Sequence, residues 1–441
     1  MTTARQTGLR QVIRLPHATA MVVGTIIGAS IFVQPSEVAG QVPSLFAVLL
    51  VWLISGVLTL IGALACAELA STFTQSGGVY VYLKEAYSPA VGFLWGWAMF
   101  WSVHSGIIAV VSVVFARYTA YFIPLSDAGI RVVAIGVIVV LSAVNYLGVR
   151  HGSTLQTLFT WGKLLAIALI IVVGLTLGAG LPEHFVPSST PNPVTLSKFG
   201  TALVAGLFAF GGWHMVTYNS EETVDSRRTI PRALVIGTSI VTVCYLAMNT
   251  VYMYVLPLDT VASSTRVAAD AADALIGFGG GAVMSGIVMF STFGALTGII
   301  LSGPRVYYSM AQDGLLFPWA GGLHPKYGTP HRAIVIQGIW ASILVATGTF
   351  QVLFTRVIYT EWIFFALMTA GLIMLRRRPG NDSGFRMWGF PMLPGLFVVA
   401  SLAIVVNQIV TDPRESIFGL SLILLGLPVY FFWTRKGIAK N

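Results

Sequence analysis

The stretch Gly24-Thr25-Ile26-Ile27-Gly28-Ala29-Ser30-Ile31-Phe32 interrupts the first long apolar segment of the chain, and Pro35 follows it. A second interruption, Phe208-Ala209-Phe210-Gly211-Gly212-Trp213-His214, lies inside the sixth apolar segment. Small residues at both places weaken helix continuity in the middle of a membrane. Paired interruptions at corresponding positions of two halves are typical of a transporter site between inverted repeats. The sequence therefore predicts two broken helices around a central binding site.

A packing role is the alternative for the first interruption. Gly24 and Gly28 form a GxxxG pattern, which lets two membrane helices approach closely. This reading explains the first stretch about as well, but it does not explain the second.

The composition around these stretches is that of a membrane protein. Of 441 residues, 56% are hydrophobic and 9% are charged, whereas soluble domains carry about 25% charged residues. The charges fall between apolar runs long enough to cross a hydrocarbon core. We expect twelve spans, at residues 16–41, 44–70, 88–123, 129–150, 152–178, 195–223, 230–257, 280–311, 331–349, 352–377, 391–410 and 415–434.

The charge and the cysteine content narrow the class of protein further. The basic residues fall mainly on one predicted side, so the net charge of +9 indicates cytoplasmic termini and not nucleic-acid binding. Cys66 and Cys244 lie inside apolar segments and offer neither a disulfide framework nor metal-ligand spacing. We expect no metal and no cofactor. No cleavable signal is recognisable, so the first span itself is expected to direct insertion.

Family motifs accompany both interruptions. The stretch at 24–32 resembles the GxxxGSGIF signature of the amino acid–polyamine–organocation transporter superfamily. Residues 208–213, with Glu221-Glu222 and Ile230-Pro231-Arg232-Ala233, are similar to the FAYxGW…EE…LPxA pattern of the L-type amino acid transporters and their bacterial relatives. Similar motifs at 291–296, 311–314 and 419–430 extend the resemblance over essentially the whole chain.

The resemblance implies the leucine-transporter fold, an all-α membrane protein of twelve transmembrane helices with helices 1 and 6 broken. It divides the chain into a cytoplasmic tail (1–15), a first inverted repeat (16–178), a second (195–377) and two accessory helices (391–434). It also implies transport of an L-amino acid by alternating access in the plasma membrane. Mammalian members bind a glycoprotein subunit through a cysteine between spans three and four. That loop, Pro124 to Arg131, has no cysteine, so we expect no disulfide-linked heavy subunit.

A zwitterion at the membrane centre needs partners for both of its charges, and an unwound helix supplies them. Beside Gly28, the groups expected to bind the carboxylate are the amides of Ala29, Ser30 and Ile31. The groups expected to accept from the ammonium are the carbonyls of Ile26, Phe208 and Gly211. Phe208 is also the candidate outer gate. Substrate size is expected to be read by aromatic residues of the third span together with Phe210, Trp213 and His214.

Lys163 lies within the fifth predicted span, near its start. A lysine there is explained equally well by snorkelling to the membrane interface and by a functional role. In the L-type branch the matching lysine stands where sodium-coupled relatives bind their cation. The resemblance therefore implies that Lys163 replaces a metal ion, links the two unwound helices and makes exchange sodium-independent. Tyr252 and Ser291 match polar positions expected to approach Lys163, although simple packing explains them equally.

Two departures from the family pattern fall in the site. Gly28-Ala29-Ser30 replaces Gly-Ser-Gly, which puts a side chain where glycine is usual. His214 and Glu361 stand at positions that are commonly asparagine. An ionisable residue within the membrane is costly and usually functional. The alternative for Glu361 is an ion pair with Arg356 at the outer surface.

The leading hypothesis is sodium-independent exchange of neutral L-amino acids. Within transport, the alternative is a proton-coupled carrier or a carrier of cationic amino acids or amines that uses Glu361 or His214. A membrane receptor or scaffold is the alternative from another class. No enzyme motif is recognisable. We expect inner-gate or loop-anchoring roles for five charges near cytoplasmic ends, Glu68, Glu221, Glu222, Arg305 and Asp313.

Overall fold

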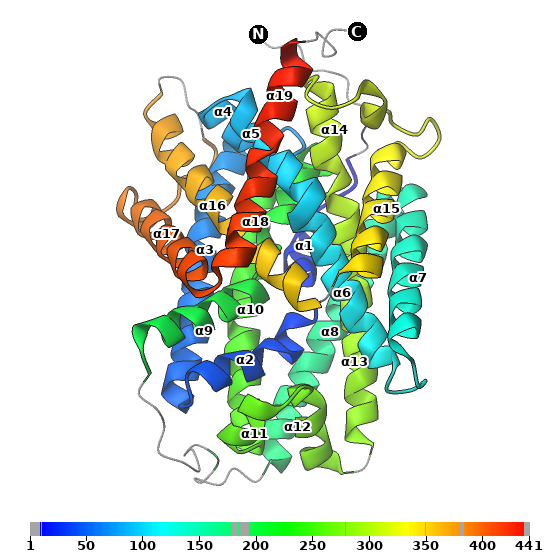
Figure 1. The fold of residues 1–441 in the computed structure, drawn as a ribbon, viewed down its shortest axis with the longest axis vertical. Coiled ribbons are helices and arrows are strands. Elements are labelled where there is room, and N and C mark those ends of the chain that lie inside the picture. Colours follow the sequence, from blue (N-terminus) through cyan, green and yellow to red (C-terminus); the bar gives the residue numbers. More distant parts are fainter. Residues whose placement is uncertain are drawn as a thin grey trace.

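The computed structural model describes residues 9, 11–178, 184, 194–277, 279–348, 350–378 and 383–435, and only the backbone of 350–358 and 435. Within these ranges the chain is helical and contains no β-strand. Most helices run along the long axis of the molecule (Figure 1). The expectation of an all-α membrane fold is confirmed. Most of the tail 1–15 lies outside the described residues, and the tenth span is described by its backbone alone up to residue 358.

Nine helical segments of the described chain are long and apolar enough to cross a membrane. Each matches a predicted span within a few residues. They are α3 (Leu45–Thr72), α5 to α6 (Pro89–Thr119), α7 (Asp127–Tyr146), α8 (Val149–Leu177), α9 with η4 (Leu196–Glu222), α10 (Ser226–Val255), α13 with α14 (Gly280–Gln312), α17 (Met392–Thr411) and α18 with α19 (Pro413–Thr434).

The other three predicted spans coincide with an interrupted helix, a shorter helix and a long helix whose first residues are described by backbone alone. The first consists of α1 (Leu15–Ile26), the 3-10 turn η1 (Ser30–Phe32) and α2 (Gln34–Gln41). The ninth and tenth are α15 (His331–Thr347) and α16 (Phe350–Arg376). The count of twelve spans and the division into two repeats remain predictions.

Several helices deviate from the expected continuous spans. A π-helical turn, η2 (Met99–Val103), separates α5 (Pro89–Ala98) from α6 (His104–Thr119). The eighth span divides at Gly303 because Pro304 has no amide to continue α13 (Gly280–Ser302) into α14 (Pro304–Gln312). Leu425 divides α18 (Pro413–Leu424) from α19 (Gly426–Arg435). Four short helices in expected loops are too short to span: α4 (Val79–Ala86), α11 (Leu258–Ser263), α12 (Val267–Ile276) and η5 (Pro318–Gly321).

The two ends of the molecule differ in charge and in structure. Helices α4, α14 and α19 lie at one end, and α2, α11 and α12 lie at the other (Figure 1). Lys84 of α4 and Arg376 at the end of α16 belong to the first end, which we call the α4–α14 end.

α1 lies inside the bundle, in contact with α8, α10, α13 and η4. Its break is therefore enclosed by protein and not exposed to lipid, as irregular backbone in a membrane must be.

Candidate functional site

The first break leaves backbone amides without partners. α1 ends at Ile26, and the amide of Gly28 turns back to the Ile26 carbonyl at 2.8 Å. The amides of Ala29, Ser30 and Ile31 donate no hydrogen bond to any described residue. Successive free amides in one turn form a concave set of donors that suits an anion. Gly24, one turn earlier, is a packing residue, since a Cβ there would lie 2.3 Å from the Thr160 hydroxyl of α8. The packing interpretation of the GxxxG pattern thus applies to Gly24, and the broken-helix interpretation applies to Gly28.

The second break is fixed by a glycine that no other residue replaces easily. α9 (Leu196–Ala209) ends before Phe210, and the 3-10 helix η4 begins at Trp213. Gly212 has φ +97°, and a Cβ on it would lie 3.0 Å from the Thr25 carbonyl. The Thr25 hydroxyl lies 2.7 Å from the Met21 carbonyl and 3.1 Å from the Gly212 carbonyl, so its one proton is shared between its own helix and the second break.

Tyr245 of α10 also joins the two breaks, and sequence reasoning missed it. Its hydroxyl lies 3.1 Å from the Ile26 carbonyl and 2.9 Å from the Ala209 carbonyl, the last residues of α1 and α9. The Ile26 carbonyl accepts from the Gly28 amide and shares the one Tyr245 proton with the Ala209 carbonyl, so the expectation that it is unpaired is wrong. The Phe208 carbonyl accepts from the amides of Gly211 and Phe210, and no described residue donates to the Gly211 carbonyl. No motif marks Tyr245 in the sequence.

A small cavity of about 30 Å³ lies between the breaks, room for roughly one water molecule. It is lined by Thr25, Ile26, Gly28, Ser30, Ile107, Val111, Phe208, Gly211, Gly212, Met215, Ile299 and Glu361. An amino acid requires more space than this. The site is therefore contracted in this conformation, and some of its walls must move before a substrate enters.

The aromatic side chains expected to read substrate size do not line this cavity. Phe210 packs behind it against Trp52 and Tyr245, and Trp213 packs against Phe365 with ring centroids 5.0 Å apart. The third span contributes the aliphatic Ile107 and Val111 and no aromatic ring. A helical pattern shows which residues are apolar, but it does not show which of them face a cavity and which face a neighbouring helix.

Lys163 is fully buried and holds backbone carbonyls from two helices. Its Nζ donates to Ile27 at 2.6 Å, to Ser291 at 3.0 Å and to Gly24 at 3.3 Å. The snorkelling alternative is wrong, because a snorkelling lysine reaches water. The expectation that Lys163 links the two broken helices is also wrong. Among described residues its acceptors belong to the α1 break and to α13.

The two polar residues expected near Lys163 differ from each other. Ser291 supplies a carbonyl to the ammonium, and its hydroxyl donates to the Gly28 carbonyl at 3.0 Å. The Tyr252 hydroxyl has no hydrogen-bond partner among the described residues and is not part of this cluster. Two helical turns separate it from Tyr245, the α10 residue that does reach the break.

Glu361 and His214 form a buried pair. Glu361 is 4% exposed and lines the cavity, so its alternative as an outer-surface residue is wrong. The side chain of Arg356 lies outside the described residues. Glu361 Oε1 is 3.9 Å from His214 Nε2. The His214 ring contacts four aromatic rings, those of Trp95, Trp213, Tyr218 and Phe365.

Ion pairs close the α4–α14 end. Arg305 binds Glu222 through two hydrogen bonds of 3.1 and 3.0 Å, with both side chains fully buried. Arg376 lies 2.8 Å from Glu68. Asp313 accepts from Lys84 at 2.8 Å and from the Tyr80 hydroxyl at 2.7 Å. Burial and the Asp313 carboxylate raise the pKa of Tyr80, which keeps its phenol a donor. Glu221 lies beside Glu222 on η4.

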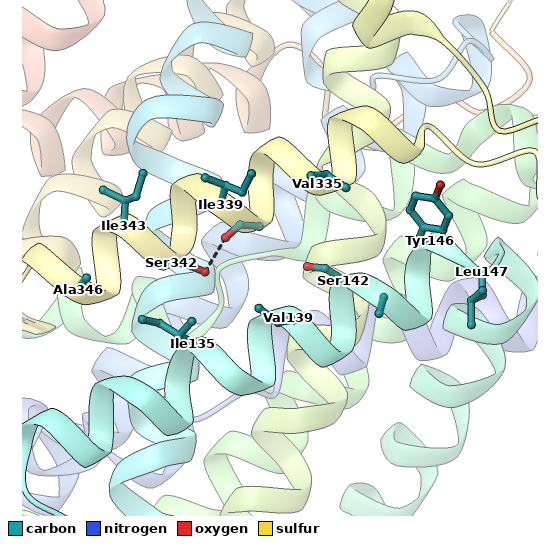
Figure 2. A pocket seen from close by; sticks show the side chains of 12 residues that line it. Ile135, Val139, Ser142, Tyr146, Leu147, Val335, Ile339, Ser342, Ile343 and Ala346 are labelled. Carbon is teal, nitrogen blue, oxygen red and sulfur yellow. Dashed lines mark hydrogen bonds between the residues drawn. The ribbon is translucent and has the colours of Figure 1, made fainter.

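A much larger groove lies away from the breaks. It has a volume of about 730 Å³ and lies between α7 and α15, where Ile135, Val139 and Ser142 face Val335, Ile339 and Ile343 (Figure 2). Val139 and Ile339 are more than half exposed on the outside of the bundle. This groove faces the lipid and has no charged lining, so it is not the site for a zwitterion.

Comparison with known proteins agrees with this arrangement. Residues 13–431 match the amino acid permease family. The chain is 31% identical to the serine/threonine exchanger SteT of Bacillus subtilis, over 97% of this chain and 98% of that one. It is 31% identical to the human b(0,+)-type amino acid transporter 1, over 98% and 89%. It is 30% identical to the human cystine/glutamate transporter, over 97% and 87%.

Proposed function

This chain belongs to the amino acid permease family, and we propose that it exchanges L-amino acids by alternating access without sodium. Membership makes it a multi-pass membrane transporter and not an enzyme, and it leaves the receptor or scaffold hypothesis without support. Exchange is proposed because one relative is named an exchanger and aligns over nearly its whole length. Neutral amino acids are proposed as substrates because the described cavity lining carries no charged group apart from Glu361.

One observation supports the proposal that transport is independent of sodium. The Lys163 ammonium lies among the carbonyls of Gly24, Ile27 and Ser291, and the three oxygens surround it as they would surround a monovalent cation. An ammonium attached to the chain does not dissociate. The first break therefore keeps its shape without any ion from solution, and transport needs none.

The breaks supply the groups that recognise the amino acid backbone. We assign the carboxylate to the free amides of Ala29, Ser30 and Ile31 beside Gly28. The ammonium is assigned to the carbonyls of Phe208 and Gly211. Phe208 lines the contracted cavity, and we propose that it moves as the outer gate when substrate enters.

The closed end is proposed to be cytoplasmic. The basic residues of the α4–α14 end favour this orientation by the positive-inside rule, with both termini inside and the plasma membrane as location. The Arg305–Glu222 pair then acts as part of an inner gate that opens during each cycle. We propose no disulfide-linked partner, and a non-reducing gel of the protein from its native membrane tests this.

Counterflow in proteoliposomes tests the function. Vesicles containing the purified protein are loaded with one unlabelled L-amino acid, and uptake of labelled neutral amino acids is followed with sodium or choline outside. We expect uptake that requires internal substrate and is equal in both salts. Uptake that depends on sodium would refute the role of Lys163, and uptake without internal amino acid would refute exchange.

A further inference from the structure

Glu361 is the only ionisable side chain among the described residues that line the cavity between the breaks. Its atom Oε1 has no hydrogen-bond partner among those residues, and neither has either ring nitrogen of His214. Oε1 and Nε2 are 3.9 Å apart, too far for a hydrogen bond. Buried polar atoms are nearly always bonded, and one left unpaired is destabilising. The carboxylate thus has an unused acceptor at the cavity.

The substrate groups that all amino acids share have partners elsewhere in the site. The free amides after the first break suit the α-carboxylate, and the Gly211 carbonyl, to which no described residue donates, suits the α-ammonium. Glu361 comes from α16, an element that contributes to neither break. It is therefore left to contact the part of the substrate that varies, the side chain.

A buried carboxylate needs either a proton or a cation as its partner, because an unpaired charge inside a membrane protein is very costly. With a proton, Glu361 is neutral and compatible with a neutral side chain. Without it, the carboxylate attracts an ammonium or guanidinium and repels an anionic side chain.

We propose that Glu361 selects the substrate side chain according to its own protonation. The site takes neutral amino acids while Glu361 carries a proton, and amino acids with a terminal ammonium once that proton is lost. This inference rests on the proposed function as an amino acid transporter and names the substrate classes of that same site.

Other groups near Glu361 are accounted for by their contacts. Tyr218 interacts electrostatically with Glu361, Cys66, Tyr82 and Tyr307, and these phenols and thiol ordinarily stay neutral between pH 5 and 8. His104 of α6 bonds the Ile299 carbonyl at 2.7 Å through Nε2. Arg376 pairs with Glu68, and Arg305 pairs with Glu222. Lys84 of α4 pairs with Glu85 and Asp313, and Arg117 and Tyr118 lie in the last turn of α6. η2 and α17 contain no ionisable residue, and those of α18 are Arg414 and Glu415 at its start. His214 and His104 remain as the competing titratable groups.

The experiment compares two substrates of similar shape, lysine and norleucine, which differ by the terminal ammonium. Counterflow of each labelled amino acid is measured with the full chain in proteoliposomes, at about pH 5.5 and about pH 8, between which the deprotonated fraction of a buried carboxyl rises. We expect the lysine-to-norleucine uptake ratio to rise at least about tenfold from the lower to the higher pH. Glu361→Gln should give the same ratio at both pH values, whereas Glu361→Asp should keep the rise.

Controls separate the competing causes. Glu37→Gln makes the same chemical change on an exposed residue of α2 and should keep the wild-type profile. His214→Gln and His104→Gln should keep the rise if Glu361 alone selects. If Glu361→Gln does not fold, the wild-type and Glu361→Asp ratios decide the question.

A wild-type ratio that does not change with pH, with norleucine still exchanged, would overturn this inference and leave the proposed function standing. A folded Glu361→Gln that loses both substrates equally would also overturn it, because the carboxylate would then bind the α-ammonium. Absence of counterflow for every amino acid, in wild type and in Glu37→Gln, would instead refute the proposed function.

Discussion

Single side chains hold the backbone of both breaks in place. Lys163 donates to carbonyls at the first break, and the single Tyr245 proton is shared between the last carbonyls of both interrupted helices. Each side chain replaces hydrogen bonds that a continuous helix would make internally. In a membrane no water performs that task, so the loss of either donor leaves buried carbonyls unpaired.

Lys163→Ala should lower both stability and transport. It leaves the carbonyls of Gly24, Ile27 and Ser291 without this donor, at about 1–3 kcal/mol for each group left unpaired. We expect a lower melting temperature in detergent and slower counterflow. Lys326→Ala, on an exposed lysine, is the matched control and should melt like wild type. Equal melting of both variants would contradict the role assigned to Lys163.

Tyr245→Phe and Tyr252→Phe form a second matched pair on one helix. The Tyr245 hydroxyl bonds Ile26 and Ala209, whereas the Tyr252 hydroxyl bonds no described residue. Removing a buried hydrogen-bonded hydroxyl typically costs about 1 kcal/mol. Tyr245→Phe should therefore melt earlier and exchange more slowly, and Tyr252→Phe should melt at the wild-type temperature or above it. The reverse order would show that Tyr245 does not hold the breaks together.

At the scale of the helices, each break contains a glycine, and the two glycines Gly28 and Gly212 serve different purposes. Gly212 needs its positive φ and its close approach to Thr25. A Cβ on Gly28 would meet only the Ala295 methyl at 3.7 Å, an ordinary contact. Gly28 therefore keeps space beside the cavity, and Gly212 keeps the geometry of the chain.

Alanine and leucine substitutions distinguish these purposes. Gly212→Ala should lower stability by about 1–2 kcal/mol, the usual cost of a left-handed conformation for a residue with Cβ. Gly28→Ala should fold with wild-type stability, while Gly28→Leu should fold and lose uptake because the larger side chain fills the cavity. Melting curves and substrate binding to the purified variants measure both effects. Retained substrate affinity in Gly28→Leu would move the site away from the first break.

At the scale of the whole molecule, ion pairs at the α4–α14 end close one face of the bundle. Arg305 joins α14 to Glu222 at the end of η4, and the Glu222 carbonyl accepts from the amides of Val12 and Ile13. The end of the sixth span, the eighth span and the segment before α1 are thus fastened together. Opening this face requires these contacts to separate.

Removing one partner of a buried pair leaves the other charge uncompensated. Arg305→Ala should therefore lower stability by about 3–5 kcal/mol. Lys84→Ala breaks a partly exposed pair with Asp313, which is worth at most about 1 kcal/mol. The two melting temperatures measure the difference. Similar losses in both variants would show that Arg305 and Glu222 do not hold this face closed.

The sequence by itself determined the fold class, the positions of the nine long apolar segments found among the described residues and the places of the two breaks. These features are local, because an apolar run of sufficient length crosses the membrane wherever it occurs, and glycine weakens a helix at its own position. The residues of the motifs at 24–32 and 208–213 also led to the family.

Only the tertiary structure decided which groups meet at the breaks. Tyr245 and Tyr252 look alike in sequence, and only the rotation of α10 brings one of them to both carbonyl ends. The same holds for the acceptors of Lys163, for the burial of Glu361 and for the aliphatic lining from α6. Hydrogen bonds between distant segments depend on how helices pack and rotate against each other, and a single helix's pattern of apolar residues does not contain that information.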